Sequence, residues 1–195
     1  MLRDEAIARE VRAGLAPATL RTYRWNQPAV SLGRRQRLED LPQDLLAKGL
    51  PIVHRPTGGG AVLHHADEFT YALALPRSAF HNRLRLTELP VHVHRELKEQ
   101  LQARGILPVD ALEFVERDSG PPSTLCFEAP VRGDLLYRGR KVAGSALRVW
   151  RDGLLIQGSI QKLPVAREVL LDSLGAVIRR LLSARTQTPV GAHEC

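Results

Sequence analysis

One cysteine of the chain lies where a nucleophile could act. Cys126 follows a Pro/Ser-rich loop (residues 117–123) within the segment Thr-Leu-Cys-Phe-Glu-Ala-Pro, residues 124–130. A thiolate is a strong nucleophile, and a neighbouring cation would stabilise it. A single free cysteine is also commonly a small buried side chain with no chemical role. The segment by itself therefore leaves catalysis and packing both open.

A lysine opens a run of small residues in the segment Arg-Gly-Arg-Lys-Val-Ala-Gly-Ser-Ala, residues 138–146. Lys141 begins a predicted strand whose interior holds Gly144, Ser145 and Ala146. Small residues in the middle of a strand allow a ligand or another backbone to lie against the sheet. A lysine directed into such a groove could polarise a carbonyl or hold a phosphate. The alternative is an ordinary basic hairpin at the surface.

A glycine-rich loop occupies residues 55–64, Arg-Pro-Thr-Gly-Gly-Gly-Ala-Val-Leu-His. Gly58, Gly59 and Gly60 permit positive φ and a close approach of the backbone to a ligand. Successive backbone N–H groups can cradle an anion or an acyl carbonyl, and Arg55 would add a fixed positive charge. The loop lacks the Lys-[Ser/Thr] ending of a P-loop and the GxGxxG spacing of a dinucleotide fold. A glycine cluster without function is the alternative.

Composition excludes several classes of protein. The 195 residues are 44% hydrophobic and 25% charged, which are the values of a globular chain. Cys126 and Cys195 are the only cysteines, too few for a disulfide framework or a cysteine zinc site. We find no apolar run of about 18 residues and no signal peptide, and therefore expect a cytoplasmic protein without a membrane contact.

The chain is basic, with a formal net charge of +7 and a pI near 10.1. A basic surface suggests an anionic partner. The basic residues are scattered and only 5% of residues are aromatic, so we expect no nucleic-acid partner. An acidic protein remains a candidate, as does a solvated surface without a partner.

Hydrophobic periodicity predicts an α+β (α/β) fold with a mixed, mostly antiparallel sheet and helices packed on one side of it. The Asp152-Gly153 pair is a strong hairpin signal. We expect a single domain over residues 1–183 and a disordered tail over residues 184–195. The expected helices are residues 4–13, 42–49, 86–104 and 165–182, and the expected strands are residues 19–25, 29–33, 51–55, 61–64, 69–75, 111–116, 134–137, 141–150 and 154–160.

These segments together resemble the lipoate–protein ligase and octanoyltransferase family, which is related in fold to the biotin ligases. The resemblance rests on residues 29–33, the glycine loop with Glu-Phe-Thr-Tyr at 68–71, the run Gly-Arg-Lys-Val-Ala-Gly-Ser-Ala at 139–146, and Gln-Gly-Ser-Ile at 157–160. It implies a biotin/lipoate-ligase-like catalytic domain that attaches an eight-carbon acyl group to one lysine of a carrier domain. By the resemblance, the acyl site is lined by Arg55, Gly58, Gly59, Gly60, Ala61, Val62, Leu63, His64, Gly144, Ser145 and Ala146.

Within the family the chemistry divides. The Cys-Phe-x-x-Pro segment at Cys126 is similar to the nucleophile segment of cysteine-dependent octanoyltransferases. That reading makes Cys126 and Lys141 the catalytic pair, octanoyl–acyl carrier protein the donor, and a lipoyl domain or a glycine-cleavage H-type protein the acceptor. No cofactor and no metal are then needed.

Two alternatives stay open. An ATP-dependent lipoate ligase would use ATP and Mg²⁺ through lipoyl-AMP, and Cys126 would then be a packing residue. A non-catalytic member would bind acyl groups or lipoyl domains without turnover. His64 is either a base for the incoming amine or a structural hydrogen-bonding residue.

Overall fold

The fold is built on a large antiparallel sheet. The computed structural model describes residues 1–80, 85–118 and 124–183. Neighbouring strands of this sheet are antiparallel at every pairing, and short hairpins join two of the five pairs. Its strand order is β1 (Thr19–Tyr23), β5 (Phe69–Pro76), β9 (Gly153–Ile160), β8 (Arg140–Trp150), β7 (Leu135–Tyr137) and β6 (Leu112–Phe114).

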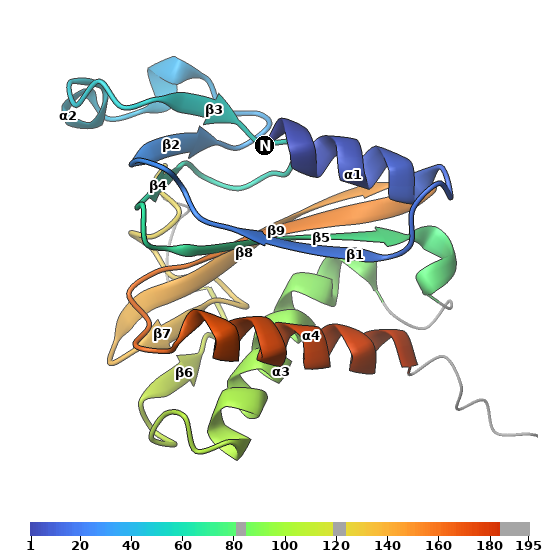
Figure 1. Ribbon diagram of the computed structural model, residues 1–195. Helices are drawn as coiled ribbons and strands as arrows, with labels where there is room; N and C mark the ends of the chain where they lie inside the picture. Colours follow the sequence, from blue (N-terminus) through green and yellow to red (C-terminus); the bar gives the residue numbers. More distant parts are fainter. Residues whose placement is uncertain (81–84, 119–123, 184–195) are drawn as a thin grey trace, which may run out of the picture.

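A second, smaller sheet lies beside one end of the large one (Figure 1). Its strands are β3 (Ile52–His54), β2 (Ala29–Leu32) and β4 (Val62–His64), with β2 parallel to β3 and antiparallel to β4. The expectation of mixed, mostly antiparallel pairing is therefore confirmed, although the strands divide between two sheets. The division matters because the glycine loop connects β3 to β4 and so belongs to the small sheet.

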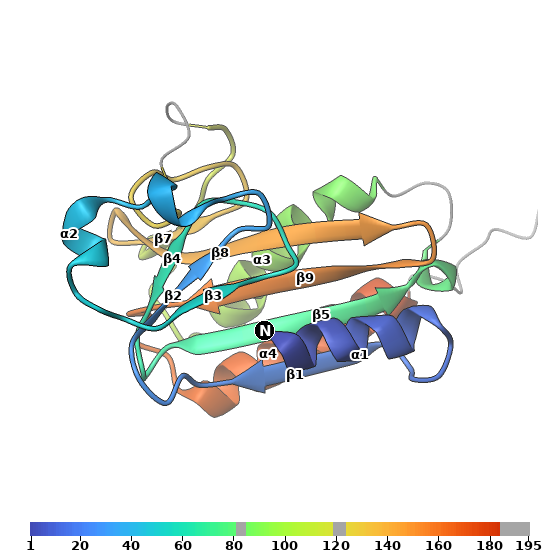
Figure 2. The ribbon, with the colours of Figure 1, turned by 90° about the horizontal axis from the view of Figure 1, so that it is seen from above.

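The helices cover both faces of the large sheet. Helix α1 (Leu2–Arg12) lies along β5 and β1 on one face, and α3 (Leu89–Ala103) and α4 (Arg167–Ser183) lie on the other (Figures 1 and 2). The expectation that helices pack on one side only is wrong. The remaining helical segments are short: α2 (Gln43–Leu46), η1 (Leu38–Asp40), η2 (Arg77–Ala79) and η3 (Leu86–Glu88).

Side-chain size along β5 explains how both faces are covered. Side chains alternate between the two faces of a strand. Ala72 and Ala74 point to one face, where Ala8 and Val11 of α1 pack against them. The other face carries large residues such as Leu73, which form the main core with α3 and α4. The small residues let α1 approach the sheet closely. Because consecutive residues of β5 are apolar, both faces of this strand can be buried.

Most element boundaries agree with the expectations within two or three residues. The helix expected over 86–104 begins as the short 3₁₀ segment η3 and continues as α3, with Pro90 in the first turn of α3, where its missing N–H costs nothing. The first strand ends at Tyr23, and Trp25 turns away to stack on His64. The expected disordered tail (184–195) and most of the Pro/Ser loop (119–123) lie outside the described residues. No helix in the described ranges has the length and apolarity to cross a membrane.

A histidine buried in the main core is expected to make the folded state less stable at acidic pH. His94 of α3 is 0% exposed, accepts a hydrogen bond from the Tyr71 hydroxyl at Nε2 (3.0 Å), and donates from Nδ1 to the Gly133 carbonyl (2.6 Å). Burial lowers the pKa of His94 from 6.5 to about 4. Between these two pKa values, the unfolded chain binds a proton at His94 and the folded chain does not. The free energy of unfolding therefore falls as the pH falls from 6.5 to about 4. The expected loss is roughly 3 kcal/mol.

The measurement is urea denaturation between pH 7 and pH 4, comparing the wild type with His94→Gln. The difference in unfolding free energy between the two proteins should shrink as the pH falls, because the variant lacks the titrating ring. A constant difference across this range would show that His94 does not carry the pH dependence.

Candidate active site

A β-bulge directs the lysine of the small-residue run. Leu135 pairs with Ala143 while Leu136 pairs with Lys141, so Val142 is an extra residue on β8. A bulge reverses the alternation of side chains beyond it. Val142 and Ala143 are both buried in the core with α3 and α4. Lys141 and Gly144 consequently face the same side, opposite to that core, and a Cβ added at Gly144 would lie only 3.0 Å from the Lys141 Cε.

The ammonium group of Lys141 lies between a carboxylate and the cysteine. Its Nζ is 2.6 Å from the Asp134 Oδ2, and both side chains are at most 5% exposed. The same Nζ donates to the Cys126 carbonyl and lies 3.8 Å from the Cys126 Sγ, within hydrogen-bond range for sulfur. Burial raises the pKa of Asp134, and the Lys141 ammonium opposes this. The buried cation thus has one anionic partner and is placed to stabilise a second, the thiolate.

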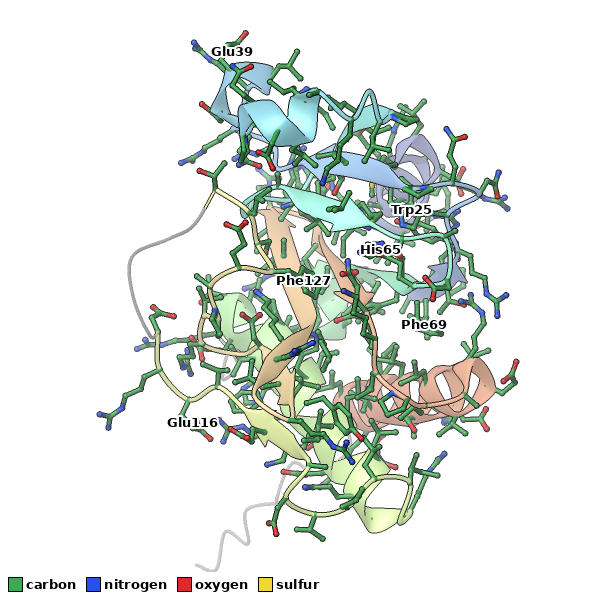
Figure 3. All side chains as sticks on the ribbon, turned by 90° about the vertical axis from the view of Figure 1, so that its left-hand side faces the viewer. Trp25, Glu39, His65, Phe69, Glu116 and Phe127 are labelled. Atoms are coloured by element: carbon green, nitrogen blue, oxygen red, sulfur yellow. The ribbon has the colours of Figure 1, made fainter. Side chains whose placement is uncertain are left out.

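The backbone of the glycine loop holds the cysteine segment. The Cys126 N–H donates to the Ala61 carbonyl (2.7 Å), and the Ala61 N–H donates to the Thr124 carbonyl (2.8 Å). These two bonds form a short parallel bridge between the end of the glycine loop and the cysteine segment. The adjacent Phe127 lies where the two sheets meet (Figure 3). Cys126 is half-buried and is one of the residues that line a pocket between the two sheets.

Arg55 shapes the glycine loop from inside. Its side chain is buried, and it donates from Nη2 to the carbonyls of Gly58 (2.7 Å) and Gly60 (2.6 Å). Its Nη1 donates to the Ser31 carbonyl (2.9 Å) and hydroxyl (3.1 Å). Four of the five N–H donors of this buried guanidinium have acceptors, and these hydrogen bonds fix the loop geometry. Gly59 has φ +85°, a conformation that other residues rarely adopt.

A narrow pocket opens between the two sheets beside the cysteine. Its free volume is about 30 Å³, which is room for roughly one water molecule. An eight-carbon chain is several times larger than this free volume. The lining is mostly apolar in its exposed area and includes the small residues of β8. Residues from both sheets meet there, among them Arg55, Val62, His64, Cys126, Gly144 and Ala146.

Three buried side chains in this pocket region form a Ser–His–Glu chain. His64 donates from Nδ1 to the Glu68 Oε1 (2.5 Å), since a carboxylate only accepts, and its Nε2 accepts from the Ser31 hydroxyl (2.7 Å). Burial lowers the pKa of His64 although Glu68 opposes it. Burial also acts to raise the pKa of Glu68, but hydrogen bonds, led by His64, bring it below its ordinary value. A neutral imidazole beside an ionised carboxylate can accept a proton.

The structure brings together most, not all, of the residues expected at the site. Arg55, Val62, His64, Cys126, Gly144, Ser145 and Ala146 line the pocket, and Lys141 contacts Cys126 from behind it. Gly58 and Gly59 line a neighbouring groove instead. Gly60, Ala61 and Leu63 are absent from the pocket wall: Gly60 accepts from Arg55, and Ala61 and Leu63 pack in the small-sheet core. The catalytic roles themselves stay predictions.

Sequence reasoning missed the carboxylates and hydroxyls that support these groups. Asp134, Glu68 and Ser31 are each buried polar residues, and the hydroxyl of Thr70 also donates to Glu68. A polar residue at the start of an apolar strand, as Asp134 is before β7, was the one available signal. No group of three or more His, Cys, Asp or Glu side chains in the described ranges could hold a metal ion.

A single glycine holds the glycine loop against the small sheet. Any Cβ at Gly33 would overlap the carbonyl oxygen of Gly59, and backbone on both sides gives little room to adjust. Gly33→Ala is therefore expected to lower the unfolding free energy by about 1–3 kcal/mol. Gly58→Ala is the matched control, since nothing lies within 4 Å of its Cβ position. Chemical denaturation of both variants tests this, and equal stabilities would contradict the close contact.

Comparison with known proteins agrees with this architecture. The family model described as "Lipoyl protein ligase A/B catalytic domain" matches residues 1–162. The chain is 39% identical over 181 residues to the octanoyltransferase LipM of Exiguobacterium sp., covering 88% of this chain and 64% of that protein. It is 33% identical over 175 residues to LipM of Oceanobacillus iheyensis, covering 88% and 62% respectively. The chain thus spans somewhat less than two thirds of the length of these curated relatives.

Solved structures share the fold. A crystal structure of lipoate-protein ligase A bound with ATP aligns with a TM-score of 0.68 at 19% identity, over 92% of this chain and 78% of that one. Ta0514, a putative lipoate protein ligase from T. acidophilum, aligns with a TM-score of 0.67, also at 19% identity and with the same coverages. The chain belongs to the lipoyl protein ligase A/B catalytic domain family.

Proposed function

We propose that this protein is an octanoyltransferase that moves an octanoyl group from acyl carrier protein to a lysine of a lipoyl carrier domain through a thioester on Cys126. The observation that carries the proposal is the Lys141 ammonium 3.8 Å from the Cys126 sulfur. Curated relatives at 33–39% identity are named octanoyltransferases, which supports the acyl group and the reaction class.

The first step is an exchange between a thiol and a thioester. The Cys126 thiolate, stabilised by Lys141, attacks the carbonyl carbon of the octanoyl thioester. A new C–S bond forms to Cys126, the C–S bond to the donor breaks, and the proton of the Cys126 thiol ends on the donor sulfur. The bond made and the bond broken are of the same kind, so the step needs no ATP. The Lys141 ammonium lies close enough to stabilise charge that develops on the carbonyl oxygen.

The second step transfers the acyl group to an amine. The carrier-domain lysine attacks the thioester carbon, a C–N bond forms, and the C–S bond to Cys126 breaks. The amine loses a proton, and His64 is the base that we assign, because its Nε2 is unprotonated and Glu68 stabilises the resulting imidazolium. The Ser31 hydroxyl donates to this Nε2, so a proton that the amine gives to the Ser31 oxygen can pass on to His64. The product is an amide, which makes the transfer irreversible in practice.

The test is the intact mass of the protein after mixing with octanoyl–acyl carrier protein in the absence of ATP. An octanoyl adduct that hydroxylamine removes supports the thioester route. No adduct, together with modification of a lipoyl domain once lipoate, ATP and Mg²⁺ are supplied, would identify an ATP-dependent ligase instead. Binding of a lipoyl domain without either modification would contradict both reactions.

A further inference from the structure

A basic groove lies next to the thiol pocket along β8. It has a volume of about 430 Å³ and is lined by Arg34, Arg35 and Arg148, by Gly58 and Gly59, and by the last residues of β8. No acidic residue lines it. In the described part of the chain, none of the three guanidinium groups forms an ion pair. Three unpaired cations in one concave site attract an anionic group.

The groove and the pocket share one face of the same strand. Gly144 and Ala146 line the thiol pocket, and Arg148 and Trp150 line the groove. Alternate residues of a strand face the same side, so these four follow one another along β8. The two sites are adjacent at the glycine loop, because a Cβ at Gly59, which lines the groove, would lie 3.7 Å from the Cβ of Ala146, which lines the pocket. A long, thin ligand could therefore occupy both sites at once.

The separation of the pocket and the groove along β8 indicates the kind of ligand that could reach both. Arg148 is four residues beyond Gly144, which corresponds to about 13 Å along an extended strand. A phosphopantetheine arm extends over about 16 Å from its phosphorus to its sulfur. A thioester at Cys126 would place the phosphate of such an arm beside the arginines. The apolar surface of Trp150 lies along this path.

The chemistry of the groove fits a phosphodiester better than a protein helix. Guanidinium groups bind phosphate oxygens with two parallel hydrogen bonds. The guanidinium carbon of Arg148 lies 4.5 Å from the centre of the Trp150 ring, and its Nη1 reaches the Pro56 carbonyl (3.4 Å), so it is partly held in place. A groove of this volume accommodates a small ligand or a chain. A helix about 10 Å wide would need a broader surface.

We infer that the groove formed by Arg34, Arg35 and Arg148 binds the phosphodiester of the phosphopantetheine arm that presents the acyl thioester, with acyl carrier protein as the source of that arm. The inference rests on the proposed function and adds how the donor is recognised. A free coenzyme A thioester carries the same arm, and the experiment separates the two sources.

The experiment compares two small donors that differ only in the phosphate, octanoyl-4′-phosphopantetheine and octanoyl-pantetheine. The rate of Cys126 acylation is followed by intact mass at low ionic strength. The wild type should react about tenfold faster per unit concentration with the phosphorylated donor. The preference should fall as salt is added, because exposed charges are screened.

The variant is the triple substitution Arg34→Gln, Arg35→Gln and Arg148→Gln, and the ratio of the two rates is measured within each protein. A ratio cancels any loss of folded enzyme. It should fall to about one in the triple variant. Arg179→Gln, the same kind of substitution at one exposed site on α4, is the control and should keep the wild-type ratio.

A wild type that accepts both donors equally, or a triple variant that keeps the preference, would overturn the inference. No adduct on Cys126 with any donor would instead contradict the proposed function. The source is decided in the wild type by comparing octanoyl–acyl carrier protein with octanoyl-coenzyme A. Faster acylation of Cys126 by octanoyl–acyl carrier protein supports the carrier protein as the source of the arm. Faster acylation by octanoyl-coenzyme A would overturn that assignment.

Discussion

Cys126→Ala is expected to eliminate the octanoyl adduct and to lower the octanoylation of a lipoyl domain by about 10⁴-fold or more. In the proposed reaction the thiol forms the covalent intermediate, and no second cysteine lies in the described residues. Without it, the amine would have to attack the donor thioester directly, with only binding and the Lys141 charge to help. Intact mass and gel-shift assays of the lipoyl domain measure the two losses.

Cys195→Ala is the matched control for this prediction, because it removes the other thiol of the sequence. It should keep both the adduct and the transfer. Cys126→Ser is a second variant of nearly equal size, whose weaker nucleophile should leave at most a trace of slow acylation. Full transfer by Cys126→Ala in the presence of lipoate and ATP would show that Cys126 is a packing residue in a ligase.

Lys141→Met is expected to lower the rate of Cys126 acylation by about 10²–10³-fold, and also to destabilise the fold. Methionine keeps the apolar stem of lysine and removes the charge 3.8 Å from the sulfur. The substitution also leaves Asp134 as a buried carboxylate without its 2.6 Å partner. Breaking a buried ion pair on one side costs about 3–5 kcal/mol. Single-turnover kinetics and urea denaturation measure the two effects.

A double variant separates the two roles of this lysine. Lys141→Met with Asp134→Asn removes both charges of the pair, so much of the lost stability should return. Acylation should remain slow, because the cation beside Cys126 is still absent. Recovery of both stability and acylation in the double variant would show that Lys141 acts only through the fold.

The local elements of the fold were predictable from the sequence because they depend on near neighbours. Short apolar runs identified β5 and β9, and the Asp152-Gly153 pair marked the hairpin between β8 and β9. The observed turn is residues 151–152, with Gly153 already paired to Trp150. The turn thus lies one residue earlier than the Asp-Gly pair indicates. Turn propensity shows where the chain reverses, but it does not determine which residues form the last hydrogen-bonded pair.

The assignment of α1 to the second face of the sheet was not predictable from α1 alone. Its apolar face would suit either side of the large sheet. The small residues Ala72 and Ala74 on β5, more than sixty residues away, provide the surface on which Ala8 and Val11 pack. Such a choice depends on the complementarity of two distant segments, which no local pattern encodes.

The candidate reactive groups could be named from the sequence alone: a thiol at Cys126, an amine at Lys141, and a glycine loop with the freedom to lie close to a ligand. Their meeting depends on the tertiary structure. The bulge at Val142 turns Lys141 toward Cys126, and the Ala61 backbone holds the cysteine segment in place. Asp134 and Glu68 pair with Lys141 and His64 because the fold buries them. A carboxylate removed from water needs such partners, and the tertiary structure supplies them. Residue types therefore determined which chemistry was available, and long-range register and burial decided where it is assembled.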